Sequence, residues 1–467
     1  MTEYIGKIEK PAPIETDLVY VQISDSLMMS GDADAKWVDD YYAKVYEGMP
    51  GYKKPEHYME LPLWISVISG MAKGSYNQQV HIATDVEKSA EELAETPGTL
   101  LFSTIESNAP HTKALVEKLA HKRIIMGGHV DPADFSHYPN VTFLSNPSEL
   151  KAHLPGTDPS ATPDNSLFAG QEVIPRLTLS TGCLFACEFC MVPRKIDTPD
   201  DEHIWKQVDS FKPLGFELVY LDDKTFGQAP NWRMIGDVRS EIRKYNPKFK
   251  GFIIQTTANI AAGDGRKEDG YLEAFDELGV EYTEIGVESV NPKTFQAMRK
   301  PYHLKHLETV MDKARTVGMP IIPNYIFGHP LDNGKYDNFI AWTEEHKDVI
   351  AAVNVNFLSV LYGASQIRKQ RNLPTAQDVT DLDQNAYRKS WLSETQTVDM
   401  LQAVRAVYYT TSGEDFYPVA YEDELTRIDV EDVVFNAINR ARSDPSKAPM
   451  LRNDVPARDY WRNIPKE

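Results

Sequence analysis

The sequence predicts an α/β fold in which two successive regions each alternate short apolar strands with helices. Short apolar runs recur from residue 18 to residue 358, and amphipathic stretches of helical spacing separate them. Polar residues or glycines follow most of the runs. A stretch rich in Pro, Ser, Thr and Asp at 151–170 interrupts the alternation and indicates a linker between the two regions.

The first region, residues 1–150, is expected to form an open parallel sheet with helices on both faces. The run 61–71 is apolar on several sides, which indicates a buried helix, and Asn108-Ala109-Pro110 is typical of a helix start. An aromatic insertion at 31–60 precedes the buried helix. It forms a lid, a partner surface or a packed satellite cluster. The expected strands are 18–23, 79–83, 98–104, 123–126 and 140–144.

The second region, residues 171–363, is expected to form six strand–helix units and therefore a partial (β/α)6 barrel. Polar residues follow its strands at their carboxyl ends, where barrel enzymes build their sites. Residues 364–467 look helical and polar, with helical spacing at 398–408 and 430–442. The expected barrel strands are 174–179, 217–221, 252–256, 282–287, 321–327 and 353–358.

The composition limits the partners and the location. A formal charge of −20 and a pI near 5.1 argue against a general binder of nucleic acid, because such proteins need a basic surface. The N-terminus has no basic region followed by an apolar run, so no secretory signal is expected. No apolar stretch approaches the roughly 20 residues of a membrane-spanning helix. The sequence therefore predicts a cytoplasmic, reducing location without a membrane span.

All three cysteines lie in one short stretch, with the spacing Cys183-x3-Cys187-x2-Cys190, and Phe189 precedes the last of them. Three thiolates at this spacing can bind three irons of a cubane cluster and leave the fourth iron open to a small molecule. A structural zinc site would need a fourth ligand at short spacing, and the nearest downstream histidine, His203, is irregularly placed. An odd cysteine count without an export signal argues against a disulfide framework.

The cysteine stretch, with Phe189, resembles the signature of the radical S-adenosylmethionine (SAM) superfamily. The resemblance implies a [4Fe–4S] cluster on Cys183, Cys187 and Cys190, with SAM bound to the open iron. It also implies one-electron cleavage of SAM to methionine and a 5′-deoxyadenosyl radical, with Phe189 near the adenine. The electron would come from a donor such as a flavodoxin or a ferredoxin.

Other strand ends resemble the SAM-binding positions of this superfamily. The stretch 219–226 resembles its second strand, where a carboxylate accepts hydrogen bonds from the SAM ammonium group. The alternative for the two aspartates there is that they are ordinary loop acids or helix caps. The stretches 285–289 and 325–330 resemble the family's fourth and fifth strands. The SAM contacts that the resemblance implies are Phe189, Asp222, Asp223, Gln255, Glu288, Ser289 and Gly328.

The first region resembles the cobalamin-binding domain that precedes the barrel in one radical SAM class, which implies a Rossmann-like fold. In that class a Gly-Gly-x-His loop follows the fourth strand, whereas His129 here directly follows Gly128. Taken alone, Gly127-Gly128-His129 favours an ordinary tight turn. The cobalamin contacts that the resemblance implies are Ser103, Thr104, Gly127, Gly128 and His129.

The resemblance as a whole implies cobalamin-dependent methyl transfer to an unactivated carbon of a small-molecule or peptide substrate. One alternative keeps the cluster and SAM but performs cyclisation, rearrangement or oxidation without methylation, with a first region that binds no cobalamin or does not take part in methylation. Another alternative is an iron–sulfur or zinc regulatory protein. That alternative leaves the polar ends of six barrel strands without a function.

Overall fold

The computed structural model describes the fold in residues 17–29, 41–53, 61–105, 108–128, 130, 132–187, 189–190, 192–263, 271–332, 335–358 and 394–413. The chain divides into two compact units. The first comprises Met1–Leu27 and Pro62–Phe168, and the second comprises Met28–Leu61 and Ala169–Glu467. Each unit contains a parallel sheet with helices, so the predicted α/β class is confirmed.

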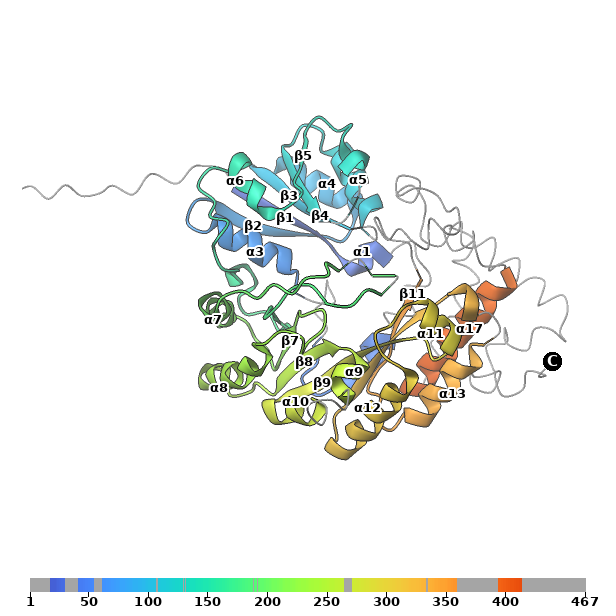
Figure 1. Cartoon of the computed structure of the whole chain (residues 1–467). Helices are drawn as coiled ribbons and strands as arrows, with labels where there is room; N and C mark the ends of the chain where they lie inside the picture. Colours follow the sequence, from blue (N-terminus) through green and yellow to red (C-terminus); the bar gives the residue numbers. More distant parts are fainter. Residues whose placement is uncertain are drawn as a thin grey trace, which may run out of the picture. The chain divides into compact units, whose positions relative to one another are not determined.

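The first unit is a five-stranded parallel sheet with the strand order β2-β1-β3-β4-β5 (Figure 1). This doubly wound order places a topological switch point between β1 and β3, where ligands bind at the carboxyl ends of the strands. Both β1 and β3 contain a continuous apolar run whose residues are buried, which is typical of strands covered on both faces of a parallel sheet. The strands are β1 Asp17–Ile23, β2 Asn77–Ala83, β3 Thr99–Thr104, β4 Ile124–Gly128 and β5 Val141–Phe143.

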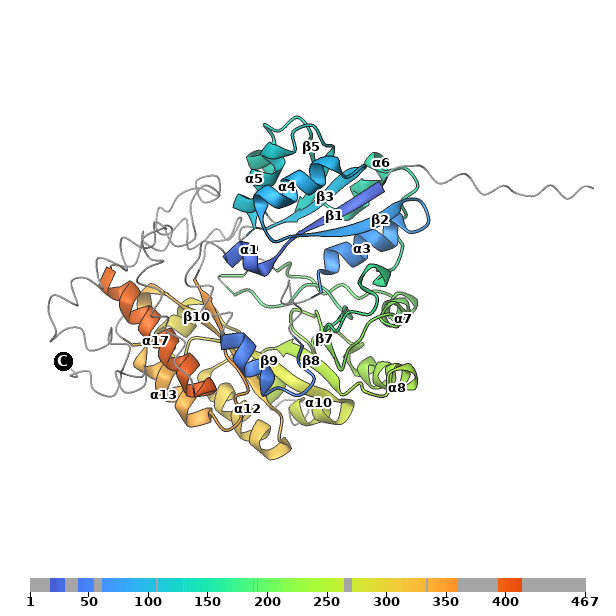
Figure 2. The same cartoon turned by 180° about the vertical axis from the view of Figure 1, so that it is seen from behind.

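Helices cover this sheet. Helix α4 begins where the side chain of Asp85 accepts a hydrogen bond from the Lys88 N–H. The α4 and α5 helices pack against each other (Figure 2). The helices of this unit are α3 Leu63–Ala72, α4 Val86–Glu95, α5 Ala109–Lys118 and α6 Leu150–His153, and the short α1 Asp25–Met29 follows β1.

The stretch expected to be a linker at 151–170 differs from that expectation, because its residues up to Phe168 pack within the first unit. Ser66 of α3 donates a hydrogen bond to Asn165, and the backbone of Thr162 passes so close to α3 that a Cβ on Gly70 would lie 1.9 Å from its carbonyl oxygen. Asn165 is buried and contacts α3 through this hydrogen bond, whereas other polar residues of the stretch, such as Asp158 and Ser160, are exposed to solvent.

The second unit is a six-stranded parallel sheet in sequential order from β6 to β11, as a partial (β/α) barrel requires (Figure 1). β10 is buried along its whole length. The register between β9 and β10 shifts at Asn324 and Tyr325, which produces a bulge just before Glu288. The strands are β6 Arg176–Leu177, β7 Leu218–Leu221, β8 Gly251–Thr256, β9 Val280–Glu288, β10 Ile321–Phe327 and β11 Asn354–Phe357.

The helices between these strands follow the expected alternation, with α9 and α11 as short additions. Of the C-terminal region, the structure describes residues 394–413, and the stretch 430–442 lies outside the described residues. The helices are α7 Asp201–Ser210, α8 Ile235–Tyr245, α9 Ala258–Ala262, α10 Leu272–Leu278, α11 Pro292–Ala297, α12 Leu304–Val317, α13 Asp337–His346 and α17 Glu394–Ser412.

The aromatic insertion belongs to the second unit, not to the first region in which the sequence places it. Its residues 41–47 are helical, and in Figure 2 this dark blue helix lies beside α17. Tyr41 stacks on Tyr408 of α17 with 4.0 Å between ring centroids, and its hydroxyl accepts a hydrogen bond from the Val353 N–H. The described part of the insertion is therefore a packed cluster at the amino ends of the barrel strands.

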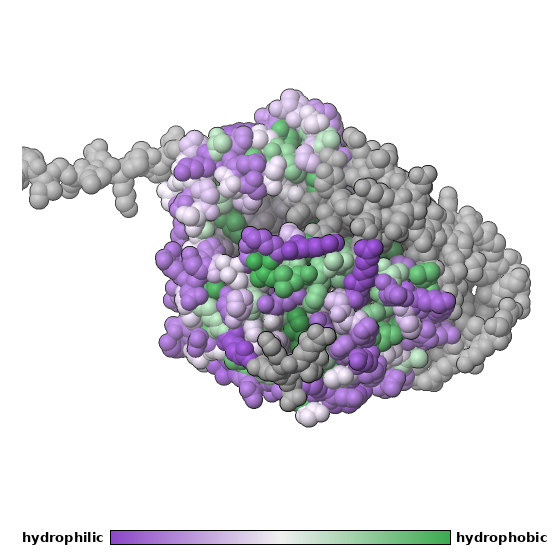
Figure 3. Space-filling model, viewed as in Figure 1, coloured by the Kyte–Doolittle hydropathy of each residue, from purple (hydrophilic) through white to green (hydrophobic). Residues whose placement is uncertain are grey.

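The surface of the described residues is mixed in polarity. Figure 3 shows hydrophilic residues over much of the visible face, with hydrophobic ones between them. The large hydrophobic side chains with the highest exposure are Ile105, Leu184 and Leu331. None of the described helices is long and apolar enough to cross a membrane.

Candidate cluster and cofactor sites

The cysteine loop leaves the carboxyl end of β6, and Asp223 at the end of β7 holds its first residues. Asp223 accepts hydrogen bonds from the N–H groups of Leu179 (2.9 Å) and Ser180 (3.0 Å) and from the Ser180 hydroxyl (2.5 Å). Burial raises the pKa of Asp223 to about 6, although these hydrogen bonds favour the carboxylate. Asp223 therefore fixes the path of the chain into the cysteine loop.

A second set of contacts closes the loop on itself. The Thr181 N–H donates to the Asp197 carbonyl at 2.8 Å, and the Cys183 N–H donates to the Pro193 carbonyl at 2.9 Å. Between them, Gly182 has a φ of +84°, and a Cβ at this position would lie 1.7 Å from the Lys195 carbonyl oxygen. The close backbone approach and the left-handed conformation both require glycine here.

The three cysteines are free thiols whose surroundings fit a cluster. The Cys183 Sγ lies 3.2 Å from the hydroxyl of Thr225, and the Cys190 Sγ accepts a hydrogen bond from the Val192 N–H at 3.5 Å. Burial raises the pKa of the Cys187 thiol, and the positive charge of Lys300 acts in the opposite direction. The Val192 N–H is a hydrogen-bond donor to the sulfur of Cys190, and the charge of Lys300 favours the Cys187 thiolate that iron requires.

Two of the residues expected to bind SAM have partners in the protein. Asp222 accepts a hydrogen bond of 2.6 Å from Arg176 and is 3.2 Å from the Lys224 ammonium group. Ser289 donates to Asp332 at 3.1 Å and accepts from the Asn291 N–H at 3.0 Å. Both side chains therefore hold the carboxyl ends of their strands in place.

The other expected SAM positions lie at the same edge of the sheet. Gln255 is the penultimate residue of β8, and its carbonyl accepts a hydrogen bond from the Phe226 N–H at 2.8 Å. Gly328 follows β10 with a φ of +87°, which favours glycine. Phe189 packs against a small hydrophobic cluster of Met298, Ile326 and Leu358. Parallel pairing of the six strands brings these strand ends together.

Glu288 has an unusual conformation and a buried partner. Its φ is +61°, in the left-handed region that non-glycine residues rarely occupy. Its carboxylate is 2.8 Å from the ammonium group of Lys300, and the side chains of both residues are almost fully buried. The bulge in β9 just before Glu288 directs the side chain towards Lys300.

The sequence alone did not identify several side chains that shape this site. Gln228 accepts a hydrogen bond from the Leu184 N–H at 3.1 Å, and Asn231 donates to the Leu179 carbonyl at 3.1 Å. Thr225, Gln228 and Asn231 follow the two aspartates closely, so their proximity to the second strand is a usable signal. Lys300 lies after α11, and it belongs to none of the motifs that identify the site in the sequence.

In the first unit, the positions expected to contact cobalamin lie at the carboxyl ends of β3 and β4. A Cβ on Gly128 (φ +129°) would lie 1.9 Å from the Thr104 carbonyl oxygen, so the two strand ends meet closely. The Thr104 hydroxyl is buried and has no hydrogen-bond partner among the described residues. Ser103 and Gly127 are paired in the same ladder, and His129 lies outside the described residues.

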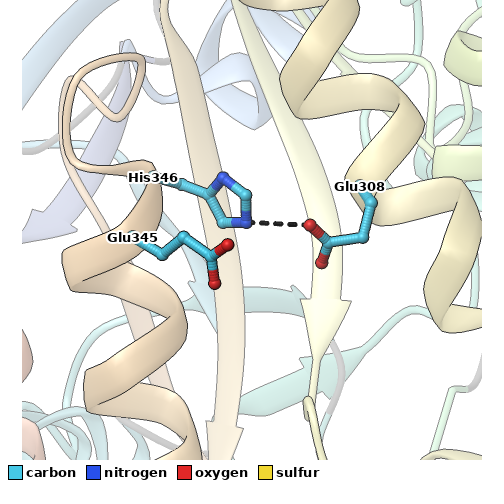
Figure 4. Close-up of side chains that lie close together, drawn as sticks. All are labelled: Glu308, Glu345 and His346. Carbon is cyan, nitrogen blue, oxygen red and sulfur yellow. Dashed lines mark ion pairs between the residues drawn. The ribbon is translucent and has the colours of Figure 1, made fainter.

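A trio of ligand-type side chains lies elsewhere, between α12 and α13 (Figure 4). Arg315 approaches the Nδ1 of His346 at 2.9 Å, and a guanidinium can only donate, so Nδ1 is the acceptor. The hydrogen of the imidazole is then on Nε2, which faces Glu308 at 3.1 Å. This arrangement, with Glu345 beside it, is a hydrogen-bonded link between two helices and is not assigned a metal.

A cavity of about 180 Å³ lies at the other end of the barrel, next to the aromatic insertion. Tyr42, Tyr46 and Tyr52 of the insertion line it together with Glu284 in the middle of β9. Burial raises the pKa of Glu284 to about 7, against hydrogen bonds from Tyr220 and Asn324 that lower it. The cavity is separated along β9 from the strand ends that carry the cysteine loop.

Comparison with known proteins identifies the second unit. A sequence model of the Radical SAM superfamily matches residues 177–342, from β6 into α13. The chain contains a radical SAM domain. The match covers the cysteine loop and five of the expected strand ends, so the resemblance stated from the sequence is confirmed. A radical SAM domain uses a [4Fe–4S] cluster and SAM, and the free cysteines described above fit that cluster.

Relatives of the radical SAM domain include the hopanoid C-3 methylase of Methylococcus capsulatus, which is 24% identical over 208 residues. That alignment covers 43% of this chain and 38% of the relative, so the chain spans little more than a third of the length of this relative.

Two solved structures are similar over most of the chain. The cobalamin-dependent radical enzyme OxsB, with aqua-cobalamin and SAM bound, has a TM-score of 0.52 at 12% identity and covers 96% of this chain and 83% of its own. The methyltransferase TsrM from Kitasatospora setae has a TM-score of 0.51 at 9% identity, covering 76% and 75%. At these identities the likeness establishes a shared fold.

Proposed function

We propose that this protein is a cobalamin-dependent radical SAM enzyme that transfers a methyl group to an unactivated carbon of a small-molecule or peptide substrate. The observation that carries the proposal is the cysteine loop, which Asp223 holds at the carboxyl edge of a six-stranded parallel sheet. The relatives support it, because they include a hopanoid methylase, and similar structures contain cobalamin.

The residues of the chain have distinct roles in this proposal. Cys183, Cys187 and Cys190 hold the cluster, and Asp223 fixes the start of their loop. When bound, the cluster supplies the electron that cleaves SAM to methionine and a 5′-deoxyadenosyl radical, and cobalamin supplies a carrier for the methyl group. Gln255 and Gly328 lie at the strand ends where SAM would be held, and Phe189 would contact its adenine.

The first unit supports the cobalamin part of the proposal. Its strand order is of the doubly wound type, in which a ligand would bind at the carboxyl ends of β1 and β3. The buried hydroxyl of Thr104, without a partner among the described residues, would donate to a polar group of the ligand, and Gly128 allows the backbone to approach it. These residues fit a ligand that reaches the sheet edge through polar groups.

The experiment is anaerobic reconstitution with iron and sulfide, followed by reduction in the presence of SAM. We expect iron and labile sulfide to bind and 5′-deoxyadenosine to form, and both should be lost in Cys183→Ala. Absorbance after hydroxocobalamin loading measures cobalamin binding, and S-adenosylhomocysteine reports methyl transfer. A protein that binds the cluster but never cobalamin would contradict the methyl-transfer proposal while leaving the radical SAM assignment intact.

A matched pair of variants locates the cobalamin site. In Gly128→Ala the new Cβ would overlap the Thr104 carbonyl, so cobalamin loading should fall severalfold while cluster content is unchanged. Gly74 has a similarly left-handed φ of +79° but nothing within 4 Å of a built Cβ, and Gly74→Ala is the control. Equal cobalamin loading in the two variants would argue against a site at Gly128.

A further inference from the structure

Lys300 carries a positive charge into the interior of the barrel unit next to the cysteine loop. Its side chain is only 4% exposed, and its Nζ is 2.8 Å from the Glu288 carboxylate. The Nζ also lies 5.7 Å from the ring centroid of Phe189 and 5.2 Å from that of Tyr302. Burial lowers the pKa of Lys300, but the charge of Glu288 raises it further, so Lys300 is a cation at neutral pH.

The surrounding backbone is shaped to hold this charge. A Cβ on Gly286 would lie 2.6 Å from the Glu288 carboxylate and 3.0 Å from the Lys300 Nζ, so the absence of a side chain there leaves room for the pair. The Tyr302 hydroxyl donates to the Gly286 carbonyl and fixes the ring under the ammonium group. Glu288 adopts a strained φ of +61° in the same place. These contacts on several sides hold the Lys300–Glu288 pair in one geometry.

Lys300 reaches the cysteine loop through the ring of Phe189. Phe189, which lies under the ammonium group, precedes Cys190 and is two residues from Cys187. Charges in a buried environment are weakly screened by water and salt, so their fields extend further than those of surface charges. The reduction potential of an iron–sulfur cluster depends on the charge and hydrogen bonding around it.

We propose that the buried ammonium group of Lys300 raises the reduction potential of the cluster on Cys183, Cys187 and Cys190, and that Glu288 partly offsets this effect. An electron from an external reductant enters the cluster and adds negative charge, which a nearby cation stabilises. The inference rests on the cluster of the proposed function and is independent of cobalamin and methyl transfer. Lys300 acts through its field and is not a ligand of iron.

The test is a potentiometric titration of the reconstituted holoprotein with dithionite, followed by electron paramagnetic resonance in the absence of SAM. We expect Lys300→Gln to shift the potential to more negative values, with a roughly threefold to tenfold lower ratio of reduced to oxidised cluster at a fixed potential. Glu288→Gln should shift it the other way. Opposite signs distinguish a field effect from damage to the loop, which would move both variants alike.

Two further variants complete the design. Lys195→Gln removes a cation from the same region whose side chain is 75% exposed, so its potential should match that of the wild type. Lys300→Arg keeps the charge and should restore the wild-type potential. Shifts of one sign in Lys300→Gln and Glu288→Gln, or no shift in either, would overturn the inference.

Folding and assembly have separate readouts. Iron and labile sulfide are measured for every variant before its titration. If Lys300→Gln fails to hold a cluster, Glu288→Gln decides alone: a positive shift supports the inference and any other result overturns it. If the wild-type protein assembles no cluster, the proposed function itself fails.

Discussion

At the scale of single residues, the acids expected to contact SAM are bound to groups of the protein. Asp223 accepts two backbone N–H groups, Asp222 pairs with Arg176, and Glu288 pairs with Lys300. A carboxylate at a buried strand end needs compensating partners in the folded protein, with or without a ligand. The sequence shows the acid, but the partners are 46 and 12 residues away for Asp222 and Glu288.

Gly182→Ala tests the backbone of the cysteine loop. The substitution places a Cβ 1.7 Å from the Lys195 carbonyl oxygen at a φ of +84°, which strains the loop by about 1–3 kcal/mol. We expect at least a roughly fivefold lower cluster content under limiting iron and sulfide, since the cysteines would no longer be held together. Iron and labile sulfide per protein measure the effect.

Gly170→Ala is the control for this variant. Gly170 has nearly the same φ, +81°, but nothing lies within 4 Å of its built Cβ. A similar loss of cluster in both variants would show that the left-handed φ, and not the close approach at Gly182, is what matters.

At the scale of elements, the aromatic insertion has a different place from the one its sequence suggests. It lies between β1 and α3 in the chain, yet it packs at the amino ends of the barrel strands. The Tyr42 hydroxyl donates to the Val353 carbonyl at 3.2 Å, and Tyr46 stacks on Tyr52 with 4.3 Å between centroids. Aromatic side chains bury large areas against whichever surface fits them, and composition does not specify that surface.

Tyr41→Phe tests the attachment of the insertion to the barrel. The hydroxyl accepts the Val353 N–H at 2.9 Å and is 2.7 Å from the Thr411 hydroxyl, so its removal leaves a buried N–H without a partner. We expect a loss of about 1–2 kcal/mol in the free energy of unfolding of the barrel unit. Urea unfolding followed by tryptophan fluorescence measures it.

Tyr271→Phe serves as the control for this variant. Its hydroxyl shows no hydrogen bond to the described residues, and its ring packs against Trp232 at 5.0 Å. The control should unfold within about 0.5 kcal/mol of the wild type, because a substitution away from a buried interaction has little effect. Equal losses in the two variants would contradict an attachment through Tyr41.

At the scale of the whole molecule, the alternation of strands and helices predicted the fold class correctly. The reason is that the spacing of apolar residues within each segment indicates a strand or a helix without reference to the rest of the chain. Which segments of the chain belong to each unit was not predictable in the same way. Residues of the insertion belong to the second unit, and those of the expected linker, up to Phe168, belong to the first. Which unit a segment joins depends on the surfaces that the rest of the chain offers to it.

The stability of the molecule should fall with rising pH because of Glu284. Its pKa is raised by burial from 4.5 in the unfolded chain to about 7 in the fold, so its contribution is fully present below 4.5 and is lost as pH rises through 7. Glu284→Gln should remove up to about 3 kcal/mol of this pH dependence. Urea unfolding at pH 5 and pH 8 provides the comparison with the wild type.

The control is Glu277→Gln on the exposed side of α10, which should leave the pH dependence unchanged. Burial also raises the pKa of other acids, such as Asp223 and Asp332, and these groups add to the fall in stability with rising pH. The contribution of Glu284 is therefore the difference in pH dependence between Glu284→Gln and the wild type. If the free energy of unfolding changes between pH 5 and pH 8 by the same amount in Glu284→Gln as in the wild type, this result would argue against a buried, neutral carboxyl group.

The sequence by itself determined the cysteine loop, its place after the first barrel strand and the alternation that builds both sheets. These features depend on residues close together in the chain, whose spacing is set by backbone geometry. Only the tertiary structure decided that Lys300 lies beside Phe189, that Glu288 is its partner and that the insertion packs at the far end of the barrel. Such contacts join distant residues, and packing of the complete core selects them.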